Sequence, residues 1–180
     1  RHTRASGKIP QIAVIMGACA GGACYAPALC DFVFMVENTS QMFLTGPQVV
    51  KAVIGEETTV EELGGAKIHS EVSGAAHFKY SDEKECLDGV KTLLSYLPKN
   101  HKEKPKRIIS KARDRSWLLQ RIVSDNQRKT YDIHDVIDTF VDEGSFFEVH
   151  KDFGISLVIG FARMDSEVLG IVASQPLGAG

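Results

Sequence analysis

Glycine and alanine crowd into one short stretch of the chain, GACAGGACYAPALCD at residues 17–31. An apolar run precedes it, KIPQIAVIM at 8–16, which is rich in Ile and typical of a strand covered on both faces. A helix-like segment follows and runs to Asp31. Small residues where a strand passes into a helix let a ligand, or another piece of backbone, approach the main chain closely. The stretch therefore predicts a strand-to-helix turn built either for a ligand or for close packing.

A helix that begins near Gly22 would leave its first N–H groups without intrahelical acceptors, which suits a phosphate or a developing oxyanion. The known phosphate motifs do not match. A P-loop needs Lys and Ser or Thr after its last glycine, where this chain has Ala23 and Cys24, and GACAGG lacks the spacing of a dinucleotide fingerprint. A hydrolase elbow needs a nucleophile between glycines, whereas Cys19 lies between alanines. An oxyanion hole and a packing turn both remain open.

The rest of the first hundred residues alternates strands and helices. Apolar runs at 31–37 and 41–46 predict strands, and a helix follows from Pro47 to a stop at Gly55. Thr59 and Glu62 have the spacing of a capping box, which predicts a short helix over VEELGG. The Gly-rich segment 64–77 is predicted to be a loop. Residues 81–98 predict an amphipathic helix with one apolar stripe: Cys86, Val90, Leu93, Leu94 and Leu97.

The composition changes at residue 99. Residues 99–116 are rich in Lys and Arg, which is typical of a solvated linker or exposed helix, with an anion- or partner-docking patch as the alternative. Residues 132–144 predict a helix that ends at Gly144 and turns Ile133, Val136, Ile137 and Phe140 inward. A strand over 145–151 and a hairpin of 154–164 with 168–176, joined by Asp165-Ser166-Glu167, complete the pattern. The order of elements predicts two α/β parts, 1–98 and 132–180, joined by a basic linker or helix over 99–131.

Charge and cysteine usage exclude several classes of function. The formal net charge of −2 gives no electrostatic case for binding nucleic acid or an anionic membrane. The four cysteines match neither zinc-pair spacing nor a disulfide framework, so we expect no metal site and free thiols in a reducing compartment. Cys19 and Cys24 have no histidine at a recognisable distance and are not predicted to be nucleophiles. His134 and His150 fall on predicted surface positions and receive no role.

Two segments carry a family resemblance. The stretch from IPQIAVIMGACAGGACYAPA to SEVSGAAHF, and YDIHDVIDTFVDEGSFFEVHKDFGISLVIGFARMDSEVLGIVASQP after it, resemble the carboxyltransferase subunit of biotin-dependent acyl-CoA carboxylases. The resemblance is strongest to the propionyl-CoA carboxylase β-chain type and the related acyl-CoA decarboxylase subunits. It implies an α/β, crotonase-like superhelix of ββα units. Residues 1–98 would then be the C-terminal part of one crotonase-like domain, and residues 132–180 the start of the next.

The resemblance also implies chemistry at the α-carbon of a thioester. In this family a pair of backbone N–H groups holds an enolate oxygen, and the matching residues here are Gly21 and Gly22. The family's usual GPCAGGAVYSPA is GACAGGACYAPA in this chain, with Ala18 in place of proline and Cys24 in place of a small apolar residue. Neither change removes a backbone donor. The cofactor implied is biotin, carried as carboxybiotin on a carrier protein, and the substrate implied is a short-chain acyl-CoA.

Further residues are implied to contact the substrate: Ala20, Ala23, Tyr25, Gly64, Gly65, His69, Ser73, Gly74 and His77. For Tyr25, half-buried packing is the alternative reading. His69 and His77 would either give an orienting hydrogen bond or satisfy carbonyl groups of their own loop.

The resemblance implies partners as well: a biotin carboxylase, a biotin carboxyl carrier subunit and further copies of the chain, in a hexamer when full-length. The compartment expected is the cytoplasm, or the mitochondrial matrix in a eukaryote. Since the sequence opens at Arg1 and leads directly into a strand, we expect it to be the middle of a longer chain. Two alternatives remain open: a decarboxylase subunit that runs the transfer in reverse, and a non-catalytic fragment that only packs or assembles.

Overall fold

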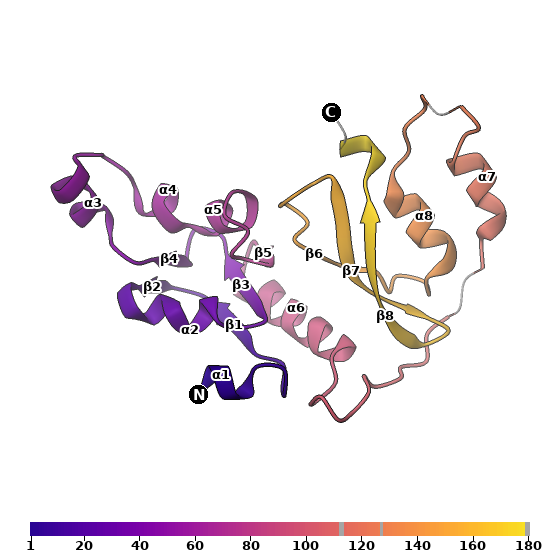
Figure 1. Cartoon of the computed structure of the whole chain (residues 1–180), viewed down its shortest axis with the longest axis horizontal. Coiled ribbons are helices and arrows are strands. Elements are labelled where there is room, and N and C mark those ends of the chain that lie inside the picture. Colours follow the sequence, from indigo (N-terminus) through magenta and orange to yellow (C-terminus); the bar gives the residue numbers. More distant parts are fainter. Residues whose placement is uncertain (112–113, 127, 179–180) are drawn as a thin grey trace. The chain divides into compact units, whose positions relative to one another are not determined.

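Two units make up the computed structural model, Arg1–Lys104 and Pro105–Gly180, and the residues described are 1–111, 114–126 and 128–178 (Figure 1). The first unit carries two small parallel sheets with helices around them, and the second packs helix on an antiparallel sheet. Both units therefore mix α and β structure, as the order of elements in the sequence predicts.

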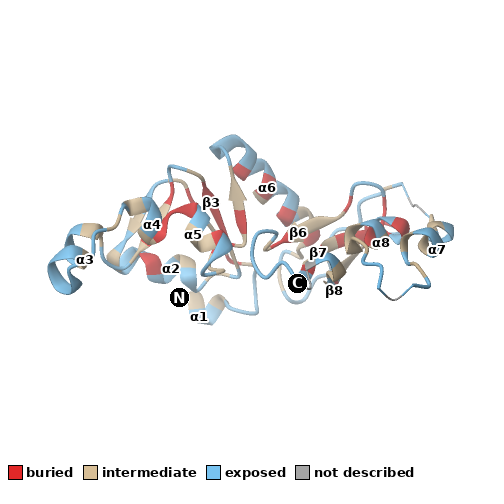
Figure 2. Ribbon diagram, turned by 90° about the horizontal axis from the view of Figure 1, so that it is seen from above, coloured by how far each residue is buried: buried red, intermediate tan, exposed pale blue. Residues whose placement is uncertain are grey.

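The larger sheet of the first unit runs in the order β1–β3–β5, with β1 at Ile12–Ile15, β3 at Phe32–Val36 and β5 at Phe78–Tyr80. All three strands are parallel. The central strand β3 is covered on both faces: Val33 and Met35 pack in one cluster, while Phe34 stacks on Phe78 with ring centroids 4.3 Å apart. In Figure 2 the buried residues gather in β3 and along one side of the following long helix. The strands predicted in 8–16 and 31–37 are confirmed, but only β3 is covered on both faces, because Val14 of β1 is 37% exposed; β5 is a strand that the sequence did not predict.

A second parallel pair joins β2, Ala18–Ala20, to β4, Gln41–Phe43, with Cys19 opposite Met42. The residues of β2 do not alternate apolar and polar, so the sequence does not predict them as a strand. They are extended because β4 supplies their hydrogen-bond partners. Directly after β2 come a 3₁₀ turn, Gly21–Cys24, and a one-turn helix α2, Tyr25–Ala28.

The helix boundaries follow local rules. Helix α3, Pro47–Ile54, has proline in its first turn and ends at Gly55 with φ +77°. Helix α4, Val60–Gly64, opens with the complete capping box of Thr59 and Glu62. These predictions are confirmed. A short helix α1, His2–Ala5, was not predicted.

The predicted loop 64–77 is partly wrong, because Ala66–Glu71 forms helix α5. The helix buries only Ala66 and Ser70, one turn apart, so its apolar stripe is too short to read among the glycines around it. Gly65, in extended conformation, precedes the first turn, and the segment becomes irregular only after Val72. Gly74 there has φ +66°.

Helix α6, Glu83–Tyr96, confirms the predicted amphipathic helix but corrects its inner face. Cys86 and Leu93 are fully buried, whereas Leu94 is 53% exposed and Leu97 lies past the helix end. Gly89 takes an inner position instead, because a Cβ there would stand 2.1 Å from the Tyr80 hydroxyl oxygen. The buried stripe of the helix therefore consists of Cys86, Gly89, Leu93 and Tyr96, and Leu94 lies outside it.

The second unit holds an antiparallel sheet in the order β6–β7–β8, with strands Phe147–Val149, Leu157–Met164 and Glu167–Ser174. Helix α8, Ile133–Phe140, packs on it through a cluster around Ile137, Val158 and Ala162. Shorter turns complete the unit: η2 at Ser116–Leu118, α7 at Leu119–Ile122 and η3 at Pro176–Gly178. The predicted strand and hairpin are confirmed.

Helix α8 ends earlier than predicted, at Phe140 rather than Gly144, and Phe140 is 39% exposed instead of inward. The helix stops because Asp142 is held elsewhere. Its carboxylate accepts the N–H groups of Asp165 and Ser166 at 3.0 and 2.7 Å. These two residues, with φ +51° and +69°, form a two-residue turn, so the predicted three-residue connection is corrected.

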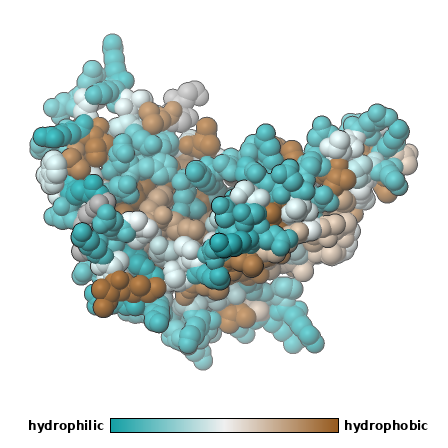
Figure 3. All heavy atoms as spheres, turned by 180° about the vertical axis from the view of Figure 1, so that it is seen from behind, coloured by the Kyte–Doolittle hydropathy of each residue, from teal (hydrophilic) through white to brown (hydrophobic). Residues whose placement is uncertain are grey.

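Exposed apolar side chains occur in both units. Val53 and Ile54 on α3 are 76% and 62% exposed, and Val172 on β8 is 78% exposed. Figure 3 shows apolar patches among the polar side chains of one face. Within the part of the chain that is described, no helix combines the length and the apolar character needed to cross a membrane.

Candidate active site

The strand-to-helix turn at Gly21 and Gly22 is formed by three successive changes of backbone conformation. Ala20, the last residue of β2, is extended at φ −118° and ψ 153°. Gly21 then adopts φ +63°, a left-handed conformation that costs side-chain-bearing residues about 1–2 kcal/mol. The chain turns sharply there and enters the 3₁₀ turn that leads to α2. Glycine at position 21 is therefore required by the backbone itself.

The turn lies at the surface of this unit. Ala20, Gly22 and Ala23 are exposed and Gly21 is half-buried. The first N–H groups of a helical turn have no acceptor within the turn itself. An outside oxygen atom can therefore approach the exposed backbone at Gly22.

Glycine at position 22 has no packing reason within this unit. A Cβ there would meet no atom within 4 Å, and the residue does not have a positive φ. The sequence left two explanations open for the glycines, a ligand site and a backbone turn, and each explanation fits a different one of the two residues. The backbone turn explains Gly21, whereas Gly22 keeps a space clear beside its N–H.

An apolar groove of about 400 Å³ lies beside the turn. Cys24 and Tyr25 line one side and His69 lies on another; its further lining residues are Ala28, Met42, Phe43, Leu44, Thr45 and Leu63. Tyr25 is 62% exposed, so the half-buried packing considered for it is wrong. The structure thus brings Tyr25 and His69 to the same groove.

The thiol of Cys24 ties the turn to the small sheet. Its Sγ lies 2.8 Å from the Cys19 carbonyl oxygen and 3.1 Å from that of Phe43, so its single proton can be donated to either. The pKa of the Cys19 thiol is raised by burial first and then by the neighbouring Cys24. A raised pKa favours the protonated form of that thiol, which reacts more slowly than the thiolate.

Both ring nitrogens of His69 are occupied by the protein. Nε2 lies 2.6 Å from the Met42 carbonyl oxygen, which can only accept, so Nε2 carries the proton. Nδ1 then accepts from the Ser73 hydroxyl at 2.8 Å. His69 and Ser73 therefore brace α5 against β4, which is the structural alternative considered for this histidine.

The remaining predicted residues lie behind or away from the groove. A Cβ on Gly64 would stand 2.3 Å from the Met42 carbonyl oxygen, and one on Gly65 would stand 1.9 Å from a Glu61 carboxylate oxygen. Both glycines are buried, so close packing explains them. The Nδ1 of His77 accepts the Val33 N–H at 3.2 Å and joins β3 to the start of β5. Gly74 forms the turn between these places.

The family model described as the carboxyl transferase domain matches residues 1–180. The chain belongs to this family. A propionyl-CoA carboxylase carboxyltransferase subunit of Haloferax mediterranei is 53% identical over 98% of this chain and 34% of that protein. A methylmalonyl-CoA decarboxylase subunit alpha of Veillonella parvula is 48% identical over 97% of this chain and 35% of that protein.

A solved structure of the transcarboxylase 12S hexamer, with hydrolysed methylmalonyl-coenzyme A bound, matches with a TM-score of 0.93 and 42% identity. The match covers 98% of this chain and 35% of that one. This carboxyl transferase chain therefore spans about a third of the length of the relatives it matches. The family resemblance and the α/β, crotonase-like fold expected from the sequence are confirmed.

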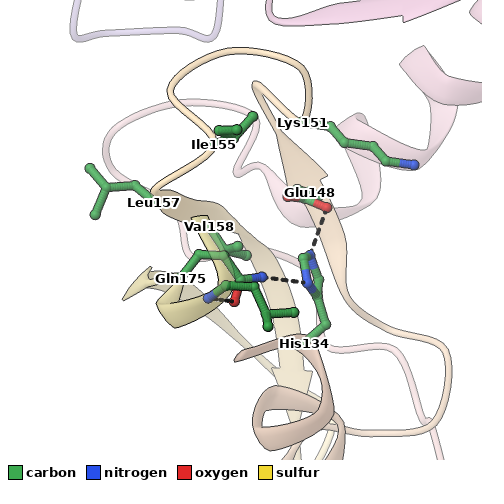
Figure 4. Close-up of a pocket in the computed structure, with 8 residues that line it drawn as sticks. His134, Glu148, Lys151, Ile155, Leu157, Val158 and Gln175 are labelled. Atoms are coloured by element: carbon green, nitrogen blue, oxygen red, sulfur yellow. Dashed lines mark hydrogen bonds and ion pairs between the residues drawn. The ribbon is translucent and has the colours of Figure 1, made fainter. Parts of the chain in front are cut away.

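The second unit of this carboxyl transferase chain holds a cavity of about 550 Å³ that the sequence did not predict. Figure 4 shows His134 of α8 between Glu148 of β6 and Gln175, which follows β8. The histidine Nε2 lies 3.0 Å from Glu148, and Nδ1 lies 2.7 Å from Asp132. Burial lowers the pKa of His134, but its two carboxylate partners raise it by more, so the net shift is upward.

This network is a structural clasp between α8, β6 and the end of β8. The two ring nitrogens of His134 contact the carboxylates of Asp132 and Glu148. The sequence signal that could have indicated it is an aspartate two residues before the histidine, at the start of α8, but Glu148 comes from a separate strand. No group of three or more His, Cys, Asp or Glu side chains in the described residues is arranged to hold a metal ion.

Proposed function

We propose that the protein containing this chain is the carboxyltransferase component of a biotin-dependent acyl-CoA carboxylase. It would transfer CO₂ from carboxybiotin to the α-carbon of a short-chain acyl-CoA. Support comes from the match to the carboxyl transferase family over the whole chain and from relatives named as propionyl-CoA carboxylase subunits. The observation that carries the proposal is the exposed turn at Gly21 and Gly22, where a Cβ at position 22 would meet no atom within 4 Å.

The residues present fit the groups that the reaction requires. A thioester and a biotin ureido group each present a carbonyl oxygen, which is an acceptor for backbone N–H groups. Gly22 leaves empty the volume that a Cβ would fill, next to those N–H groups. The adjoining groove of about 400 Å³ is lined mainly by apolar side chains, as an acyl group or its thioester arm would need. Carboxybiotin, when bound through its carrier, supplies the CO₂ and takes up the α-proton.

The contribution of this chain is electrostatic. The α-proton of an acyl-CoA is too weakly acidic for a side-chain base, so charge must move onto the thioester oxygen and be held there. The N–H groups of Gly21 and Gly22 would hold it, and each such donor is worth about 10²–10³ in rate. The Cys24 thiol keeps the turn in place through its contacts with two carbonyl groups. We assign the thioester oxygen, rather than the ureido oxygen, to this turn.

Of the other predicted residues, some would lie at the turn or the groove and others would support the backbone around them. Ala20 and Ala23 flank the turn as small exposed residues, and Tyr25 forms a wall of the groove. His69 lines the same groove, and its two ring nitrogens contact the Met42 carbonyl oxygen and the Ser73 hydroxyl. The remaining ones would support the surrounding backbone and not touch the substrate: Gly64, Gly65, Ser73, Gly74 and His77.

We also propose the domain organisation and the partners. Residues 1–98 would be the C-terminal part of one crotonase-like domain, 99–131 a linker and 132–180 the start of the next domain. The partners would be a biotin carboxylase, a biotin carboxyl carrier subunit and further copies in a hexamer, the assembly named for transcarboxylase 12S. The four free cysteines suit a reducing compartment, either the cytoplasm or, in a eukaryote, the mitochondrial matrix.

A carboxyl-transfer assay on the protein in its full natural length tests the function. Malonyl-, methylmalonyl- and glutaconyl-CoA serve as donors and free biotin as the acceptor. Gly22→Val places a side chain over the N–H pair without a clash inside the unit, and should lower kcat/KM by about 10²-fold or more. Gly17→Val is the matched control, since Gly17 is also exposed, free of neighbours and without positive φ. Normal turnover by folded Gly22→Val would contradict the assignment.

The direction of transfer is the second candidate. Methylmalonyl-CoA decarboxylase alpha subunits of two organisms are 48% and 44% identical to this chain. In that case biotin would be carboxylated from methylmalonyl-CoA during normal turnover, with the same Gly21 and Gly22 turn. A chain that neither binds acyl-CoA nor transfers carboxyl groups at full natural length would instead support a purely structural role.

A further inference from the structure

Two cysteines enclose the proposed oxyanion turn. Cys19 lies in the middle of β2, and Cys24 closes the 3₁₀ turn that follows, so Ala20, Gly21, Gly22 and Ala23 lie between them. Both belong to one packed cluster, in which Cys24 is buried and Cys19 is half-buried. The mechanism proposed above uses neither sulfur atom as a reactant.

The two thiols are close to one another. Cys24 Sγ lies 2.8 Å from the carbonyl oxygen of Cys19, which places it against that residue's own backbone. The pKa of the Cys19 thiol is raised by burial first and then by Cys24. The other two cysteines have different surroundings: Cys30 Sγ contacts the Ala26 carbonyl oxygen at 3.3 Å, and Cys86 is fully buried on α6.

We propose that Cys19 and Cys24 are a modification site, at which peroxide forms an intramolecular disulfide that closes the Gly21–Gly22 turn. One thiolate sulfur attacks a peroxide oxygen, the O–O bond breaks, and a sulfenic acid and one water result. The second sulfur attacks this S–OH group, the S–S bond forms, and the hydroxyl leaves as the second water. The sum is one hydrogen peroxide and two thiols giving one disulfide and two waters.

Exposure sets the order of the two steps. Cys19 is half-buried, whereas Cys24 is only 6% exposed, so Cys19 meets the peroxide and Cys24 displaces the hydroxyl. The thiolate is the reactive form, and the pKa of Cys19 is raised by burial and by Cys24. The disulfide therefore forms slowly at neutral pH and requires an excess of peroxide.

Disulfide formation would change the turn directly. Cys24 would lose the proton that it shares with the carbonyl oxygens of Cys19 and Phe43, and those contacts help to hold the turn against β4. The new bond would also close a ring around Gly21 and Gly22 and alter the directions of their N–H groups. This effect on activity rests on the proposed function, whereas the disulfide itself does not.

Peptide mapping tests the proposal on the protein in its full natural length. Trypsin releases one peptide, 9–51, that contains Cys19, Cys24 and Cys30. After excess hydrogen peroxide and alkylation of the free thiols, this peptide should be lighter by about 2 Da before the alkyl group is counted, with only Cys30 alkylated. Dithiothreitol should restore alkylation at all three positions.

Two variants at one position and one control make the test specific. Cys24→Ser keeps a hydroxyl donor for the two carbonyl groups but cannot form the disulfide, and Cys24→Val serves if the serine variant fails to fold. Cys30→Ser removes the neighbouring thiol and should leave the 19–24 disulfide unchanged. Carboxyl transfer, followed in parallel, should fall about 10-fold or more as the disulfide forms in the original protein and return with dithiothreitol.

The results separate the two proposals. Alkylation of both Cys19 and Cys24 after peroxide, or a disulfide that uses Cys30, overturns the inference. A 19–24 disulfide with unchanged carboxyl transfer overturns the closure of the turn. If the reduced protein transfers no carboxyl group at all, the proposed function fails, and the peptide map still decides whether the disulfide exists.

Discussion

Replacing Gly64 by alanine distinguishes a packing role from a substrate contact at that position. Gly64 ends α4 where the helix lies against β4, and a Cβ there would stand 2.3 Å from the Met42 carbonyl oxygen. It would also stand 3.1 Å from the Phe43 ring. The new methyl group is about 1 Å too close for van der Waals contact with a backbone atom, which has no rotamer by which to move away.

The expected cost follows from overpacking. Inserting one methyl group into a tightly packed contact costs about 1–3 kcal/mol, and the rigid neighbour places Gly64→Ala at about 2 kcal/mol. Helix α4 must shift away from β4, so local opening of these two elements becomes easier. Amide hydrogen exchange of α4 and β4 in the full-length protein should then speed up by about 30-fold.

Gly17→Ala is the control, because a Cβ at Gly17 meets nothing within 4 Å. It should leave exchange in α4 and β4 unchanged. If Gly64→Ala exchanges as slowly as this control and instead raises only the KM for acyl-CoA, then Gly64 contacts the substrate and the packing argument is wrong.

Two further predictions concern the second unit. The carboxylate of Asp142, a residue that is only 1% exposed, accepts hydrogen bonds from the Ser110 hydroxyl and the Ser166 N–H. Asp142→Ala should therefore destabilise the β7–β8 turn by about 2–4 kcal/mol, measured by amide hydrogen exchange. Glu143→Ala, at an exposed position, is the control and should have little effect. The pKa of His134 is raised in the folded state, so the protonated imidazole stabilises the fold. This contribution is complete at pH values below the unfolded pKa of about 6.5, and it is lost as pH rises through the folded pKa. Protection of α8 should therefore fall as pH rises above about 6.5, and His134→Gln should abolish this slope. A wild-type profile that stays flat, or a slope that survives in the variant, counts against the clasp.

Much of the fold follows from local patterns. The apolar run that becomes β3, the capping box of Thr59 and Glu62, and the stop at Gly55 are visible in the sequence because each depends on neighbours within a few residues. The short strand β2 and the helix α5 are not visible in this way, since β2 depends on β4 for its ladder and α5 has too few apolar positions.

The candidate site shows the same division. Chain order alone places Gly21 and Gly22 at a strand-to-helix turn, and the resemblance assigns them a chemistry. Burial and contact decide the rest. Gly64 is packed tightly against Met42 and Gly65 against Glu61, while Met42 and Ser73 occupy the two ring nitrogens of His69.

The sequence by itself determined the α/β class and the position of the turn at Gly21 and Gly22, because these depend on residue types at short, regular spacing, and its resemblance to known carboxyltransferases indicated the family. Only the tertiary structure decided that the turn at Gly21 and Gly22 is accessible beside an apolar groove, that Leu94 faces outward and that the Cys24 thiol lies against Cys19. Each of these outcomes depends on which surfaces meet in space. The free energy of such contacts comes from excluded volume and paired polar groups, and neither can be read along the chain.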